Sequence, residues 1–153
     1  MSRISLLMLI GLLGFSGCDD PGGLDSVTGV HGKVIFGSEW PDSLKAAAVV
    51  VFDVGLNLDS ISVVGYPVID HFITFGDPIE PGTVSSEYFI QLPPGDYIIM
   101  AIGLLVEPAV LLANEELFAR IGEFIVTPEY AVPRGPAIRE NQINEQTDWY
   151  VQF

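Results

Sequence analysis

Apolar and polar residues alternate along several short stretches of the chain, and glycine, proline, aspartate and asparagine separate these stretches. In residues 27–36, VTGVHGKVIF, Val30 and Val34 share one phase of the alternation, and His31 and Lys33 share the other. Neighbouring side chains of a β-strand point to opposite faces, so a period of two is typical of a half-buried strand. The pattern therefore predicts a strand here, with Val30 and Val34 turned inward and His31 exposed to solvent.

Similar stretches recur, and each is bounded by turn-forming residues. The further strands predicted from them are residues 46–54, 60–64, 71–75, 87–92, 97–106 and 147–153. Residues 46–54, AAAVVVFDV, are almost uninterrupted in their apolar character, which predicts a buried central strand. The segment 93–96, PPGD, carries the residues of a tight turn, with Gly95 expected at positive φ. It predicts a hairpin between the strands on either side.

Residues 108–122 break the strand pattern. Leu111, Leu112 and Phe118 recur at spacings that suit a short helix or a structured insertion, and Gly122 is placed to end it. Many short strands with regular turns are typical of a sandwich or barrel. We therefore predict an all-β fold, an antiparallel β-sandwich of about seven strands, with one short helix or structured insertion near 108–121.

The first part of the chain has a different character. Arg3 precedes an uncharged and largely apolar segment, residues 4–15, which has the length of the hydrophobic region of a signal peptide. It is shorter than the roughly 20 apolar residues that a membrane-spanning helix needs. Small residues follow, and then Cys18, the only cysteine in the chain.

The sequence Phe15-Ser16-Gly17-Cys18 resembles the lipobox of bacterial lipoproteins, with phenylalanine where leucine is usual. The resemblance implies that residues 1–17 are removed as a signal peptide and that lipid is attached to Cys18. An ordinary secretory signal with a leftover cysteine is the alternative, but a single cysteine forms no internal disulfide.

The expected organisation has three parts. Residues 1–17 form the lipoprotein signal peptide, residues 18–26 form a lipid-anchored flexible tether, and residues 27–153 form the β-sandwich domain. The last part is long enough for one domain with its own core. Several acyl chains on one residue would hold such a domain firmly to a membrane.

The net charge of the chain excludes one class of binding partner. The chain has 6 Lys and Arg residues against 20 Asp and Glu residues, a formal net charge of −14. Such a surface repels phosphate backbones, so we expect no nucleic-acid partner. Hydrophobic residues make up 49% of the chain, which excludes a disordered acidic tail.

Three stretches together resemble a known family: VTGVHGKVIF, EYFIQLPPGDYIIMAIGL and the closing PAIRENQINEQTDWYVQF. They are similar to the carboxypeptidase-regulatory-like, transthyretin-like β-sandwich domains of bacterial envelope lipoproteins. The family's "LPPG-Y" corner is matched by Leu92, Pro93, Pro94, Gly95 and Tyr97. The resemblance implies a structural domain, and it does not imply carboxypeptidase activity.

Sequence signatures of catalysis are missing. The chain has two histidines, His31 and His71, and neither stands in an HxxE or HExxH zinc pattern. A GxSxG nucleophile elbow is also missing. We expect a protein that is not an enzyme and needs no cofactor, and a hydrolase is the least favoured alternative.

Two weak candidates for binding sites remain. Asp53, Asn57 and Asp59 carry oxygen side chains at spacings that resemble part of a calcium loop, although a solvated turn between strands is the favoured explanation. Trp40 and Tyr66 lie in turn-like segments and could stack on sugar rings. For Trp40 we favour the alternative that it plugs one end of the sandwich.

The sequence therefore predicts a non-catalytic, lipid-anchored β-sandwich protein of a bacterial cell envelope, with a structural or accessory role. Its partners would be the membrane, through Cys18, and an envelope protein or glycan. The anchoring membrane would face the periplasm or the cell exterior. A carbohydrate-binding module is the first alternative.

Overall fold

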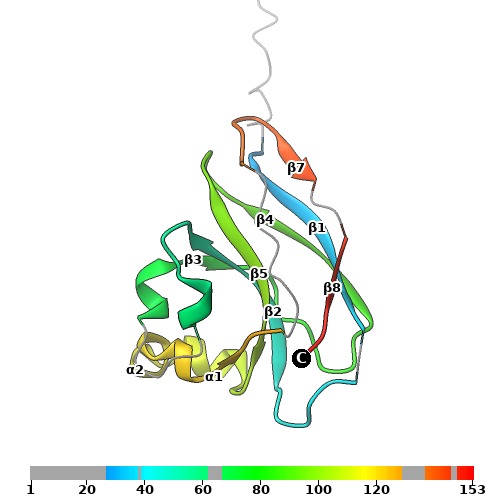
Figure 1. Ribbon diagram of the computed structural model, residues 1–153, viewed down its shortest axis with the longest axis vertical. Helices are drawn as coiled ribbons and strands as arrows, with labels where there is room; N and C mark the ends of the chain where they lie inside the picture. Colours follow the sequence, from blue (N-terminus) through cyan, green and yellow to red (C-terminus); the bar gives the residue numbers. More distant parts are fainter. Residues whose placement is uncertain (1–26, 38, 62–66, 129–136, 146–147) are drawn as a thin grey trace, which may run out of the picture.

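Two β-sheets form a sandwich in the computed structural model, which describes residues 27–153 apart from 38, 62–66, 129–136 and 146–147 (Figure 1). The strands are β1 (Gly29–Phe36), β2 (Ala46–Asp53), β3 (Phe72–Phe75), β4 (Ser85–Gln91), β5 (Tyr97–Leu104), β6 (Ile125–Val126), β7 (Ile143–Glu145) and β8 (Trp149–Val151). In sheet A, β1 lies between β4 on one side and β7 and β8 on the other. Sheet B has the order β3-β2-β5-β6. The predicted sandwich class is confirmed.

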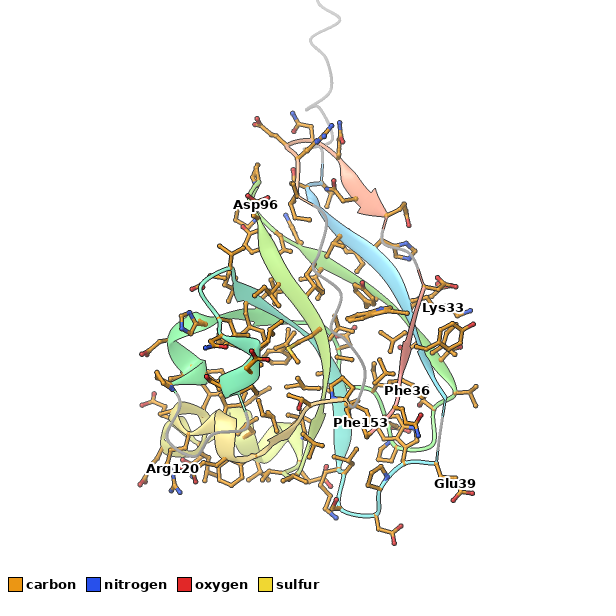
Figure 2. All side chains as sticks on the ribbon, in the orientation of Figure 1. Lys33, Phe36, Glu39, Asp96, Arg120 and Phe153 are labelled. Carbon is orange, nitrogen blue, oxygen red and sulfur yellow. The ribbon has the colours of Figure 1, made fainter. Side chains whose placement is uncertain are left out.

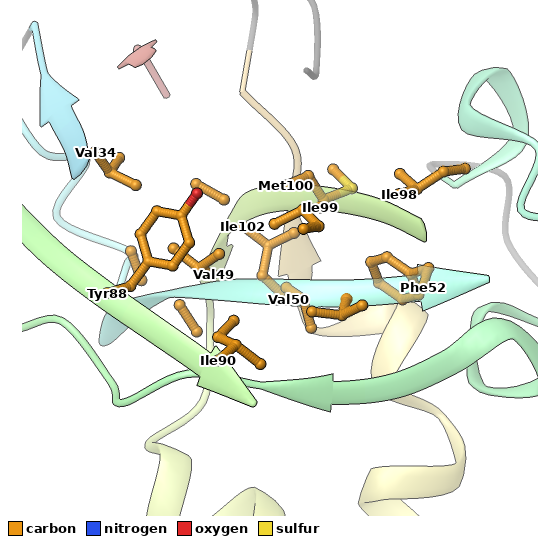
Figure 3. Packing of buried hydrophobic residues seen from close by; sticks show 14 of the residues in the cluster. Val34, Val49, Val50, Phe52, Tyr88, Ile90, Ile98, Ile99, Met100 and Ile102 are labelled. Atoms are coloured by element: carbon orange, nitrogen blue, oxygen red, sulfur yellow. The ribbon is translucent and has the colours of Figure 1, made fainter. Parts of the chain in front are cut away.

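The inward phases predicted for the best-patterned strands are also confirmed. Val30 and Val34 of β1 are fully buried, and His31 and Lys33 on the other phase are partly exposed. All of β2 except its last residue is buried, as expected of a central strand. Figure 3 shows side chains of both sheets meeting in one core, among them Val34 and Tyr88 from sheet A and Val49, Met100 and Ile102 from sheet B. This core holds the two sheets together, because burial of apolar surface is the main favourable contribution to folding.

The predicted hairpin between residues 87–92 and 97–106 is wrong. Both strands exist, but β4 pairs with β1 in sheet A and β5 pairs with β2 in sheet B. The PPGD segment is a corner that carries the chain from one sheet to the other. An alternating pattern defines a strand and its inward face, but it does not specify the neighbour with which the strand pairs.

Gly95 lies in that corner without positive φ, contrary to the prediction. It forms an antiparallel bridge with Ile138, with Gly95 N donating to Ile138 O at 3.0 Å and Ile138 N donating to Gly95 O at 2.7 Å. This pairing holds the backbone of the corner extended. Among the described residues, positive φ occurs at Gly82 (85°) and Asn141 (59°).

Two pairings in sheet A are parallel, whereas the prediction was antiparallel throughout. The strand β7 pairs with the first half of β1, in the register Gly29 with Ile143, and β8 pairs with the second half, in the register Val34 with Trp149. The bridge at Ile138 brings the chain back to the end of the sandwich where β1 begins. A strand that starts at that end must run in the same direction as β1.

The insertion at 108–121 is a run of short helices rather than one helix. It consists of α1 (Pro108–Leu112), α2 (Glu115–Ala119) and the 3₁₀ turn η3 (Ile121–Glu123), which lie beside sheet B (Figure 1). Asn114 separates the two α-helices, because its side-chain oxygen accepts hydrogen bonds from Glu116 N and Leu117 N at 3.1 Å each. Gly122 lies inside η3 instead of ending the helix.

Two further 3₁₀ turns, η1 (Leu58–Ser60) and η2 (Val68–His71), lie between β2 and β3. The strand predicted at 60–64 is therefore not observed at its first residue, Ser60, and residues 62–64 lie outside the described part. Residues 1–26, which include the predicted signal peptide, Cys18 and the predicted tether, also lie outside it, as does Tyr66. No helix of the described chain has the length and apolar character needed to cross a bilayer.

Candidate functional site

The first candidate set, Asp53, Asn57 and Asp59, lies where β2 runs into η1. Asp53 Oδ1 accepts a hydrogen bond from Gly55 N at 2.7 Å and lies 3.0 Å from His71 Nδ1. Asn57 Oδ1 accepts from Asp59 N at 3.1 Å and caps η1. Two of the three candidate side chains thus already form local hydrogen bonds, as the solvated-turn alternative expects.

A group of three or more His, Cys, Asp or Glu side chains that could hold a metal ion is not found among the described residues. These four residue types leave out the amide oxygen of Asn57, which can also bind calcium. The calcium site therefore stays a prediction.

The contact between Asp53 and His71 is a feature that the sequence did not indicate. The ion pair joins the end of β2 to η2, and the side chains are 47% and 25% exposed respectively. The hydrogen bond from His71 lowers the pKa of the Asp53 carboxyl below its usual value. The two residues are 18 positions apart, and neither has a sequence context that would have indicated the pairing.

The other histidine forms a similar pair on the outer face of sheet A. His31 Nδ1 of β1 lies 2.8 Å from Glu145 Oε2 of β7, and the two residues are direct partners in the parallel register. The hydrogen bond to Glu145 raises the pKa of His31 above its usual value of 6.5. The pair fastens the three-residue strand β7 to the middle of sheet A.

The outer face of sheet A mixes charged and apolar side chains. Tyr150 is 73% exposed, Phe89 is 45% exposed, and Ile143 is also exposed. Lys33 lies on the same face, where Glu87 is its partner across β1 and β4 (Figure 2). Exposed aromatic rings beside charged groups are features that a binding surface needs.

Trp40 lies in the connection between β1 and β2, at one end of the sandwich. Its ring packs at 4.6 Å from that of Phe36 and at 6.0 Å from that of Phe153, between ring centroids. Its indole Nε1 donates a hydrogen bond to Thr83 O at 3.2 Å. We call Phe36, Trp40 and Phe153 the end cluster; Figure 2 labels its two phenylalanines at the lower end of the molecule. These contacts favour a plug over an exposed sugar platform.

One hollow beneath the helical insertion is too small for an organic ligand. It lies between sheet B and the helical insertion, has a volume of about 20 Å³, and is lined by apolar side chains that include Val50, Phe72 and Phe118. That is room for about one water molecule. Ligand pockets usually have volumes of about 300–1,000 Å³.

Two other hollows are larger, at about 360 Å³ each. One lies between η1 and the start of β5, beside Asp59 and Tyr97. The other lies at the start of β1, beside Thr28, Pro93 and Asn141. The first is lined by Asn57 and Asp59 of the calcium candidates, but not by Asp53.

Comparison with protein-family models, with curated proteins and with solved structures found no match. The fold described above therefore rests on the geometry of the chain itself, which is a two-sheet β-sandwich with short helical pieces.

Proposed function

We propose that this protein is a lipid-anchored, non-catalytic β-sandwich of a bacterial cell envelope, which holds an acidic folded domain at a membrane for structural or accessory contacts. The observation that carries the proposal is the position of Cys18. It follows a short apolar segment and two small residues, and only ten residues separate it from Gly29, where the first strand begins. A lipid on that cysteine would keep the sandwich close to the bilayer.

The geometry of the sandwich supports such an attachment. At the start of β1, Leu92 N donates to Thr28 O and Gly29 N donates to Gln142 O, so three segments meet at this end. The chain therefore enters the domain at a well-tied end. The end cluster around Trp40 lies at the other end of β1, and eight residues of strand span about 26 Å. In an anchored protein that far end would be the one presented to partners.

The corner between the sheets supports the resemblance to carboxypeptidase-regulatory-like domains. The Tyr97 hydroxyl donates a hydrogen bond to Pro93 O at 3.0 Å. This bond gives the tyrosine of the "LPPG-Y" pattern a structural role, because it ties the start of β5 back to the corner. We propose membership of that family on this basis.

A carbohydrate-binding module remains the second candidate, and one observation favours it. The rings of Phe89 and Tyr150 are exposed on a face that also carries Lys33 and Glu87. Aromatic faces with nearby polar groups are what sugar recognition needs. On this hypothesis, Tyr150→Ala removes retention on a polysaccharide affinity gel while the melting temperature stays unchanged.

The decisive experiment for the anchor is Cys18→Ser in the full chain, expressed in a bacterial host with a labelled fatty acid. We expect loss of lipid labelling and loss of membrane association after a high-salt wash. Asp20→Ser is the matched control, since it changes a nearby residue outside the lipobox and should leave both properties intact. A Cys18→Ser protein that still sediments with washed membranes contradicts the proposal.

A further inference from the structure

The strand β4 forms the longest edge of the two sheets. Its seven residues, Ser85–Gln91, pair with β1 in an unbroken register from Gly29 with Gln91 to Ile35 with Ser85. Each of the other described edge strands, β3, β6, β7 and β8, has four residues or fewer, and the pairing of β3 has an irregularity. A long, regular edge is the kind that accepts another strand.

Hydrogen-bonded and non-hydrogen-bonded residue pairs alternate between β1 and β4, and this alternation shows which backbone groups of β4 face the open edge. Phe36 N donates to Val84 O, and Leu92 N donates to Thr28 O, so the even-numbered residues of this register exchange hydrogen bonds with β1. In an antiparallel pair, the residues that lie between the hydrogen-bonded ones direct their N–H and C=O groups away from the partner strand. In β4 these outward-directed residues are Ser85, Glu87, Phe89 and Gln91.

These backbone groups are nearly unused in the described part of the chain. One hydrogen bond reaches them there, from Ser86 Oγ to Glu87 O at 3.3 Å. The side chains of the same four residues are exposed, with Phe89 at 45%. The edge therefore offers a row of backbone donors and acceptors beside exposed side chains.

We propose that this edge pairs with the same edge of a second copy of the chain, and that the two β4 strands run antiparallel about a twofold axis at Tyr88. This inference goes beyond the proposed function and does not depend on it. In this register Glu87 lies opposite Phe89 of the second copy, and Ser85 lies opposite Gln91 of the second copy. All the outward-directed residues of both strands then exchange hydrogen bonds, and the two A sheets become one continuous sheet.

Charge and strand length favour this register over the registers centred on Glu87 or on Phe89. A shift that centres the axis on Glu87 sets two carboxylates directly opposite, which destabilises a strand pair. A shift that centres it on Phe89 leaves Ser85 without a partner. In the Tyr88-centred register Glu87 still lies opposite Lys33 of its own β1, and it faces the ring of Phe89 across the interface. Glu87 is also the one charged residue of β4, so the pairing of two copies brings one carboxylate from each β4 strand to the interface, although the chain has a net charge of −14.

Charge substitutions at Phe89 test the register directly. The full chain is studied in mild detergent by sedimentation velocity over a range of concentrations. In the dimer, residue 89 faces Glu87 of the second copy twice. The Phe89→Lys variant should therefore dimerise about 2- to 30-fold more tightly than the Phe89→Gln variant. The Phe89→Glu variant should dimerise more weakly than Phe89→Gln by a similar factor. Val110→Lys and Val110→Glu, at a 50% exposed position of α1, control for the change in net charge.

A second variant tests the backbone pairing. The N–H of Glu87 faces the open edge, so Glu87→Pro removes no hydrogen bond to β1, whereas it removes a donor from the proposed interface. We expect this variant to keep its circular dichroism spectrum and to lose self-association, while Glu87→Thr, which keeps the N–H, still associates. In the wild type, amide exchange in residues 85–91 should slow as protein concentration rises.

Either of two results overturns the proposal. One is a wild-type chain that stays monomeric at every concentration, which would leave the edge to a strand from a different protein. The other is an effect of charge at residue 89 no larger than that at residue 110, which would show that association occurs elsewhere.

Discussion

Trp40→Ala separates the two interpretations of the end cluster. If Trp40 is a plug, the substitution removes three interactions at once: ring contacts with Phe36 and Phe153, and the hydrogen bond to Thr83 O. Aromatic pairs contribute about 0.5–1.5 kcal/mol each, and a hydrogen bond contributes about 0.5–1.5 kcal/mol. Because Trp40 is half-buried, we expect a loss of about 2–4 kcal/mol, near the lower end of the range for aromatic truncations in cores.

Thermal and denaturant unfolding measure this loss. For a domain of this size, about 2–4 kcal/mol corresponds to a fall in melting temperature of roughly 6–15 °C. Trp40→Phe is the matched control, because it keeps an aromatic ring and removes the hydrogen bond to Thr83, so its loss should be smaller. A double-mutant cycle with Phe153→Ala should give a coupling of about 0.5–1.5 kcal/mol, since the two rings touch.

The opposite pattern would refute this reasoning. Under the platform interpretation Trp40→Ala leaves stability within about 0.5 kcal/mol of the wild type, as most surface substitutions do, and abolishes binding to a glycan array. Such a result would require the ring to be free of Phe36 and Phe153 in solution, and it would restore Trp40 as a sugar-binding residue.

Three further predictions follow from single contacts. Gly29→Ala should destabilise by about 1–3 kcal/mol in urea unfolding, because a Cβ there would lie 2.5 Å from the backbone oxygen of Ile90, and an unchanged midpoint would contradict the close approach. The pair of His31 with Glu145 raises the pKa of His31, so its stabilisation is complete below pH 6.5 and is lost as the pH rises through the raised pKa. The difference in melting temperature between wild type and Glu145→Gln should therefore be largest in mildly acidic buffer and vanish in alkaline buffer; a difference independent of pH would refute the pairing. Asn114→Ala should cost about 1 kcal/mol through loss of the cap of α2, whereas Asn114→Asp should cost little, as thermal unfolding can show.

Local periodicity explains what could be predicted from the sequence. The alternation in β1 and the apolar run in β2 defined both strands and their buried faces, because side-chain direction depends only on position within the strand. The same information does not determine the partner of a strand. The hairpin prediction failed at that point, since the one buried face of β4 and the almost wholly buried β5 are compatible with pairing to each other or with facing across the core.

The remaining features depend on tertiary contacts. The strands β6 and β7 have two and three residues, too few for a period to be recognised, and they exist because β5 and β1 offer edges to them. The pairs of His31 with Glu145 and of His71 with Asp53 join residues 114 and 18 positions apart. Neither charge nor spacing along the chain indicates either pair, so only the folded chain could show them.

The central place of β1 in sheet A also sets the order in which the chain can fold. The strand begins at Gly29, yet two of its three neighbours, β7 and β8, come from residues 143–151. As the chain leaves the ribosome, β1 has to wait until more than a hundred later residues have been made before its second edge is covered. Pairings so distant in sequence fold slowly, because a large loop must close before any contact is gained. Sheet B needs no residue beyond Val126, so it can form while sheet A still lacks β7 and β8.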